Sequence, residues 1–314
     1  MTTTTSSTAT NFASLTETPR SLMQIVRDSW DRAEQRMTLV GGLGCFGLLI
    51  LVFWPNVRHF VYVWSTDENY SHGFLVPLIS LYFANEASKR GPILIRAGVG
   101  IGISLLLLSI VGRLATILVP VGMVGDGAFL LGLAGVCALV LGSGALRRYW
   151  FALFFLLFMI PLPVALYSMI ASPLQLLVSR AASNVLNTLG IPVLCEGNLM
   201  TLPGDVRMFV AEACSGMRQL TGFLALTAAV AYLAPRPLWY RCIVVASSIP
   251  IAMTANIVRV TLTGLIMYSI NPQYALGTYH TVEGLLLMLL GLGLLAAECW
   301  ALNQLCGARD RVQD

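Results

Sequence analysis

Long apolar stretches that carry almost no charge recur from about residue 38 to residue 302 of this 314-residue chain. Only 11% of the residues are charged, whereas soluble domains carry about 25%. Because so few charges cannot cover a soluble surface, we expect a polytopic membrane protein in contact with membrane lipid. No basic stripe is interleaved with aromatic residues, so we expect no nucleic-acid partner.

Eight of the apolar stretches are candidate membrane helices, since a helix needs about 20 apolar residues to cross the bilayer. The predicted fold class is therefore all-α, with about eight transmembrane helices. The predicted spans are residues 38–54, 71–86, 97–118, 124–142, 149–169, 215–234, 240–268 and 280–302.

The distribution of Lys and Arg predicts that both ends of the chain lie in the cytoplasm. With the N-terminus inside, about thirteen of the 19 Lys and Arg residues fall in cytoplasmic segments and about five fall outside, as the positive-inside rule requires. We expect residues 1–36 to be a disordered cytoplasmic tail, because they begin Thr/Ser-rich and without an apolar period. Residues 37–306 form one predicted membrane domain, and residues 307–314 form a second cytoplasmic tail.

The connection between the fifth and sixth predicted spans, residues 170–214, has a different pattern. Residues 173–190 place apolar side chains on one helical face and polar ones opposite, which is typical of an external helix in the membrane interface. A ninth span is the alternative. Residues 196–198 (Glu-Gly-Asn) and 203–205 (Pro-Gly-Asp) are turn signals between short β-rich runs. We therefore predict a small external β-hairpin that leads into Cys214.

Three polar residues on separate predicted helices are expected to meet near the outer face of the membrane. Cys214 precedes the sixth span, Arg259 lies within the seventh, and His280 begins the eighth. Together a thiol, a guanidinium and an imidazole can carry out acyl transfer through a thioester, with the thiolate as the nucleophile. His280 would transfer protons, and Arg259 would stabilise an oxyanion or hold a substrate carboxylate.

Four further polar residues are candidates for supporting roles. Glu212 and Asn256 are predicted to orient Arg218 or Arg259, and Arg218 is also a candidate substrate ligand. His72 faces the same side and is a rival base. We predict no metal and no cofactor, because the cysteines and histidines show no zinc-ligand spacing.

Each candidate catalytic residue also has a structural interpretation. Cys214 could be a packing residue, or it could form a disulfide with Cys195 on the same side of the membrane, where disulfides persist. Arg259 could extend its charge to the membrane surface or pair with Glu283 or Glu212. His280 could cap a helix at the interface.

Taken together, these motifs resemble the exosortase/archaeosortase family. The resemblance implies a cysteine transpeptidase or protease of the plasma (inner) membrane, with its active site on the extracytoplasmic face and Cys214, Arg259 and His280 as catalytic residues. The matching segments are residues 70–74 (Tyr-Ser-His-Gly-Phe), 196–198 (Glu-Gly-Asn), 212–220 around Cys214, 256–260 (Asn-Ile-Val-Arg-Val), and His280 followed by Gly284.

The resemblance also implies the substrates: exported proteins with a C-terminal sorting tail of a Pro-Glu-Pro-type motif (PEP-CTERM), a membrane helix and a basic cluster. We expect the tail helix to enter between the sixth, seventh and eighth spans. The bacterial family accompanies exopolysaccharide production, so that machinery is a candidate partner. The alternative functions are a transporter or channel with Arg and His on its substrate path, and a thiol oxidoreductase that uses Cys195 and Cys214.

Overall fold

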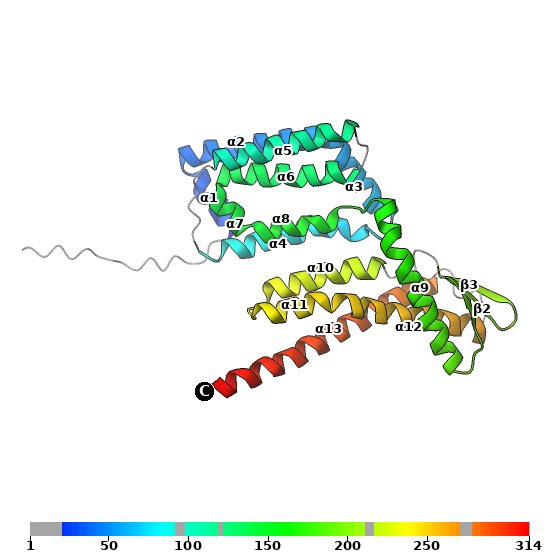
Figure 1. Ribbon diagram of the computed structural model, residues 1–314. Helices are drawn as coiled ribbons and strands as arrows, with labels where there is room; N and C mark the ends of the chain where they lie inside the picture. Colours follow the sequence, from blue (N-terminus) through cyan, green and yellow to red (C-terminus); the bar gives the residue numbers. More distant parts are fainter. Residues whose placement is uncertain (1–20, 92–97, 119–121, 211–216, 271–277, 314) are drawn as a thin grey trace, which may run out of the picture.

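The structure is a computed structural model that describes residues 21–91, 98–118, 122–210, 217–270 and 278–313. It is mostly helical, with one small β-sheet at one end of the molecule (Figure 1). The predicted all-α class is therefore confirmed, with the expected small β-element attached.

Within these residues, six helices are long and apolar enough to cross a membrane. They confirm a multi-pass membrane protein, while the predicted number of eight spans and their orientation stay predictions. The six segments are Gln35–Val52, Val99–Leu118, Gly122–Leu141, Val164–Thr188, Leu238–Ser269 and Gly284–Leu305.

The first half of the chain is a helical bundle with a phenylalanine-rich core. Its elements are α1 (Leu22–Trp30), α2 (Ala33–Val52), α3 (Trp54–Thr66), the 3₁₀ helix η1 (Ser71–Phe74), α4 (Leu75–Ser88), α5 (Val99–Leu118), α6 (Gly122–Leu141), α7 (Ser143–Arg148), α8 (Trp150–Phe155) and the 3₁₀ helix η2 (Leu156–Met159). Phe53, Phe60, Phe83 and Phe155 are almost completely buried in this core.

The second half places a helix and a sheet at one end of three longer helical segments. Its elements are α9 (Val164–Thr188), β1 (Leu194–Glu196), β2 (Leu199–Leu202), β3 (Val206–Phe209), α10 (Met217–Leu233), α11 (Leu238–Ala246), α12 (Ser248–Ser269) and α13 (Thr278–Gln313). In Figure 1, α9 and the sheet lie at the end opposite α1 and the C-terminus. Helix α1 and the end of α13 thus lie at the same end of the bundle.

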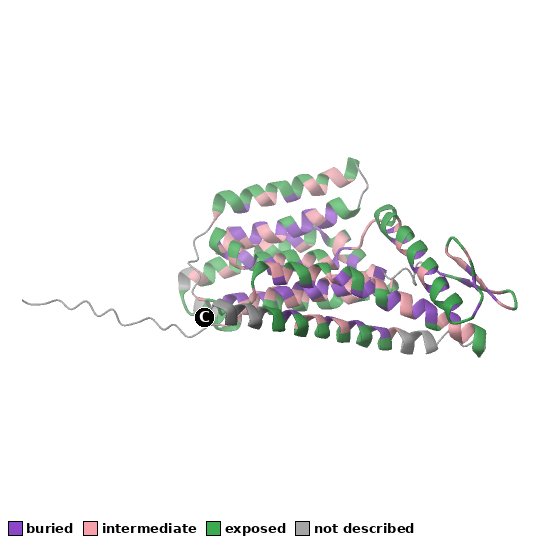
Figure 2. Cartoon of the chain, turned by 60° about the horizontal axis from the view of Figure 1, so that its bottom comes forward, coloured by how far each residue is buried: buried purple, intermediate pink, exposed green. Residues whose placement is uncertain are grey.

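Large apolar side chains are exposed on the outer surface of the bundle. Figure 2 shows exposed residues along the outer faces of α5 and α13. Leu107 and Val111 on α5 are examples, as are Leu285 and Leu289 on α13. Apolar surface of this extent is typical of contact with lipid, which supports the predicted membrane environment.

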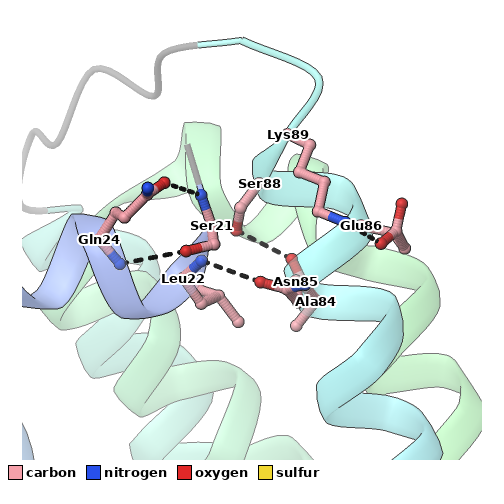
Figure 3. A network of polar contacts seen from close by, with 8 residues as sticks. All are labelled: Ser21, Leu22, Gln24, Ala84, Asn85, Glu86, Ser88 and Lys89. Carbon is pink, nitrogen blue, oxygen red and sulfur yellow. Dashed lines mark hydrogen bonds and ion pairs between the residues drawn. The ribbon is translucent and has the colours of Figure 1, made fainter. Parts of the chain in front are cut away.

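The described part of the predicted N-terminal tail is folded. Helix α1 begins with a capping box, in which Ser21 and Gln24 each accept the other's backbone N–H (Figure 3). The Leu22 N–H also donates to the side-chain oxygen of Asn85 on α4, at 3.0 Å. Residues 22–36 therefore differ from the disordered tail that the sequence predicts, because the cap and this tertiary contact satisfy backbone groups at the helix start.

The predicted fifth span, residues 149–169, is wrong as a single helix. Helices α8 and η2 end at Met159, and α9 begins only at Val164. Pro161 and Pro163 explain this break, because proline lacks a backbone donor and disfavours helical geometry in the residue before it.

The predicted interfacial helix, residues 173–190, is the larger part of α9, which continues through Pro173. Helix α9 runs obliquely to its neighbours in Figures 1 and 2, which supports an interfacial position. Its length and composition would also allow a span, so the alternative of a ninth span stays open.

The predicted hairpin is one strand larger than expected. Strands β1, β2 and β3 form an antiparallel sheet in that order. Its two turns fall at the predicted turn signals, where Gly197 and Gly204 have φ angles of +67° and +83°, a region that favours glycine. Met200, Leu202 and Met208 from the sheet are buried in one apolar cluster with residues of α9, and this packing retains the third strand.

Candidate active site

Arg259 is buried near the middle of α12. Only 5% of the residue is exposed, and Asn256, one turn earlier on the same helical face, is fully buried. Arg259 lies ten residues before the helix ends at Ser269, or roughly 15 Å at 1.5 Å per residue. A buried arginine in a membrane helix is costly and is a functional candidate by default. Asn256 and Arg259 thus both lie on the buried side of α12; a role of Asn256 in orienting Arg259 stays a prediction.

Cys214 and Glu212 lie outside the described residues, but the residues on either side of that segment are well packed. Val210 is buried, and its N–H donates to the Asn198 carbonyl at 2.9 Å. Met217 is also buried, in a cluster with Tyr167 and Ala171 of α9. Both flanks of the Cys214 segment are therefore fixed, one on the sheet and the other on α9.

One apolar cluster links the Cys214 segment to the Arg259 helix. This cluster contains Val210, which is four residues before Cys214, and Val260, which follows Arg259. Its remaining buried members come from α9, the sheet and the turn between them. The fold therefore brings the chain leading to Cys214 into the same core as the turn of α12 that carries Arg259.

His280 is the third residue of α13, and its side chain is not among those described. Helix α13 packs against α12 and α10. The contact with α10 is close, because a β-carbon on Gly291 would lie only 2.0 Å from the Phe223 ring. The start of α13 lies at the end of the molecule that also holds the sheet (Figure 1). The first turn of α13, which contains His280, is therefore at the same end as the sheet.

Arg218 is paired with an acidic residue that the sequence did not single out. The side chain of Arg218, in the first turn of α10, forms an ion pair with Glu68 at 2.5 Å. Glu68 lies after α3 and is separated from Arg218 by 150 positions. No local sequence pattern identifies such a pair. The one feature of the sequence that pointed to Glu68 as a partner was its position just before residues 70–74, on the same predicted outer side as Arg218.

His72 is placed against the break between η2 and α9. Its Nε2 atom lies 3.2 Å from the Phe158 carbonyl oxygen. Nearby, the Leu162 N–H donates to the Tyr70 hydroxyl at 3.0 Å. In the structure, His72 thus contacts the backbone carbonyl of Phe158. The sequence had suggested His72 as a rival to His280 for the role of base.

A comparison with protein families matches residues 64–297 to the transmembrane exosortase family (Exosortase_EpsH). The chain belongs to this family. The match covers most of the chain and contains all seven predicted site residues. No curated protein and no solved structure matches the chain. Membership makes the protein a membrane transpeptidase or protease of a protein-sorting system, and it argues against a transporter or channel.

For this exosortase, the structure bears on the predicted disulfide alternative. Cys195 in β1 is a free cysteine whose thiol lies 3.5 Å from the Gly197 carbonyl oxygen. Burial raises the pKa of the Cys195 thiol, and nearby Arg180 opposes this shift. Cys195 is thus not part of a disulfide in this structure, so the disulfide alternative for Cys214 gains no support. In the described part of the chain, no group of three His, Cys, Asp or Glu residues could hold a metal ion.

Proposed function

We propose that this exosortase is a cysteine transpeptidase or protease that removes the C-terminal sorting tail of exported proteins through a thioester on Cys214. Its substrates would carry a Pro-Glu-Pro-type motif, a membrane helix and a basic cluster. The active site would face the extracytoplasmic side of the inner membrane. The observation that best supports this proposal is the buried Arg259, in a turn of α12 that shares an apolar core with Val210 beside the Cys214 segment.

In the proposed first step, the Cys214 thiolate attacks the carbonyl carbon of the scissile peptide bond and forms a C–S bond. The carbonyl oxygen becomes an oxyanion, which hydrogen bonds from Arg259 would stabilise. The oxyanion collapses, the C–N bond breaks, and His280 donates a proton to the leaving amine. The tail is released, and the remainder of the substrate stays bound as a thioester.

In the second step, water or an acceptor amine attacks the thioester. His280 accepts the proton of the incoming nucleophile, and the C–S bond breaks to return the Cys214 thiolate. Water gives hydrolysis, and an amine gives transpeptidation. Arg259 exchanges no proton in either step and acts only as a hydrogen-bond donor.

Arg259 is well suited to this role for a physical reason. Inserting an arginine near the centre of a membrane helix costs on the order of 3 kcal/mol. In a buried site, donors fixed in advance stabilise developing negative charge far more than they would in water. We therefore interpret the buried Arg259 as a residue placed for catalysis at a cost in stability.

The proposal is tested with the full chain in membranes and a substrate that ends in a sorting tail. We expect Cys214→Ala and His280→Ala to accumulate normally and to lose tail removal. Cys195→Ala is the matched control and should cleave at the wild-type rate. Hydroxylamine should trap the acyl group as a hydroxamate only when Cys214 is present. Wild-type processing by either Cys214→Ala or His280→Ala would exclude the proposed mechanism.

A further inference from the structure

Three hydrogen bonds hold the chain at the break between η2 and α9. The Trp64 indole N–H donates to the Met159 carbonyl at 3.0 Å. The His72 Nε2 lies 3.2 Å from the Phe158 carbonyl, and the Leu162 N–H donates to the Tyr70 hydroxyl at 3.0 Å. Trp64, Tyr70 and His72, the three residues that bond to this break, all lie in the stretch from the last turn of α3 to η1.

The break needs these bonds because its own backbone cannot supply them. The last carbonyls of a helix have no partner within that helix, and here the helical segment ends at Met159. Pro161 and Pro163 contribute no N–H groups to the turn that follows. Unpaired buried backbone groups are costly, so Trp64, Tyr70 and His72 supply partners that the chain lacks locally.

Gly73 permits the tryptophan contact. A β-carbon at Gly73 would lie 2.3 Å from the Trp64 indole nitrogen, the atom that donates to Met159. The indole is also stacked on Phe60, with ring centroids 5.7 Å apart, and it meets Phe74 edge-on at 5.2 Å. The ring therefore has little room to shift, and any larger residue at Gly73 would displace it from Met159.

The break sets the direction in which α9 leaves the bundle. Helix α9 starts at Val164, immediately after Pro163. Its first turns pack on Met217, through Tyr167 and Ala171. Later turns pack on the core that contains Val210 and Val260. Both flanks of the Cys214 segment and the helix of Arg259 thus rest on α9.

We propose that Tyr70, His72 and Gly73 are positioning residues that fix the η2–α9 break and thereby the placement of the active-site segments on α9. This inference rests on the proposed function of Cys214 and Arg259. His72 acts as a hydrogen-bond donor to Phe158, because a carbonyl oxygen can only accept. In this role His72 transfers no proton during the reaction.

Substitution of His72 by glutamine separates the two roles. Glutamine keeps an N–H donor for the Phe158 carbonyl but cannot act as a base near neutral pH. We expect His72→Gln to stay within about threefold of the wild-type kcat, with an unchanged pH profile. His72→Ala and Gly73→Ala should lose roughly 10- to 100-fold in kcat, the scale of a small misplacement of reacting groups. The exposed His59 on α3 provides the matched control, and His59→Gln should leave kcat unchanged.

A second measurement does not depend on catalysis. Cysteines introduced at Ala171 and Met217 report the packing of α9 on α10 through their disulfide cross-linking yield. We expect His72→Ala and Gly73→Ala to lower that yield at least twofold, and His72→Gln to leave it unchanged. This readout stays informative even if Cys214→Ala proves active and the proposed function fails.

Two outcomes would overturn the inference. If His72→Gln is as inactive as His72→Ala and loses one limb of the pH profile, His72 is a base. If Gly73→Ala cleaves and cross-links like the wild type, Tyr70, His72 and Gly73 do not position the site. Should His72→Ala fail to accumulate in membranes, the pH profile of His72→Gln decides between the two roles.

Discussion

Arg218 at the start of α10 forms an ion pair with Glu68, 150 positions earlier in the chain. The pair joins the loop after α3 to the helix that follows the Cys214 segment. Glu68 is exposed, with 77% of its side chain accessible, and exposed pairs contribute only about 0.2–1 kcal/mol to stability. Any large effect of breaking it should therefore appear in activity, through the position of α10.

A charge swap tests whether Arg218 serves Glu68 or the substrate. We expect Glu68→Arg and Arg218→Glu each to reduce tail cleavage, and the double variant to recover most of it, because only the sign of each partner has changed. The measurement is kcat and KM for all four proteins. Recovery absent in the double variant would show that Arg218 itself binds the acidic residue of the sorting motif.

Replacement of Arg259 by lysine keeps the charge and removes the planar fork of donors. We expect normal accumulation in the membrane and a loss of roughly 100-fold or more in kcat, the scale seen when one oxyanion donor is removed. Cleavage and membrane levels measured in parallel check this. Wild-type kcat in Arg259→Lys would show that the planar fork of donors is not required.

Cys195 should react slowly with alkylating reagents at neutral pH. Burial raises the pKa of its thiol, and the thiolate is the reactive form. We expect labelling of Cys195 by iodoacetamide to be slow at pH 7 and to rise steeply in alkaline buffer. Mass spectrometry of labelled peptides follows Cys195 and Cys214 separately. Equal labelling rates at pH 7 would contradict the distinction between a packing thiol and a nucleophile.

Asp126 on α6 is almost fully buried and accepts a hydrogen bond from the Asn56 side chain at 2.8 Å. Replacing Asn56 by leucine leaves the carboxyl without this donor, which should lower the free energy of unfolding by roughly 1–3 kcal/mol. Thermal unfolding in detergent measures the effect. The double replacement of Asn56 and Asp126 by leucine should be less destabilised than Asn56→Leu, and a strictly additive loss would exclude this coupling.

The sequence predicted those features that depend on local chemistry. Apolar length identified the membrane helices, and the Glu-Gly-Asn and Pro-Gly-Asp runs marked both turns of the sheet. Hydropathy alone missed the break before α9, because Pro161 and Pro163 interrupt an otherwise apolar stretch. The third strand was missed because the helix that it packs on, α12, is distant in sequence.

The sequence predicted which residues belong to the candidate site better than it predicted their contacts. The apolar run of the seventh predicted span placed Arg259 and Asn256 on one helix, and both lie on its buried face in the structure. The partners of Arg218 and His72 could not be predicted. Glu68 lies 150 positions from Arg218, and Phe158 offers His72 only a backbone carbonyl, which leaves no trace in the sequence.

The contact between Gly291 and Phe223 limits how a substrate can reach this exosortase. Helices α10 and α13 meet there with the ring of one against the bare backbone of the other. The sequence suggested that the tail helix of the substrate enters among the sixth, seventh and eighth predicted spans. At the level of Gly291 the two helices leave no room for a third helix between them, so the proposed tail helix would have to enter at another level of the membrane.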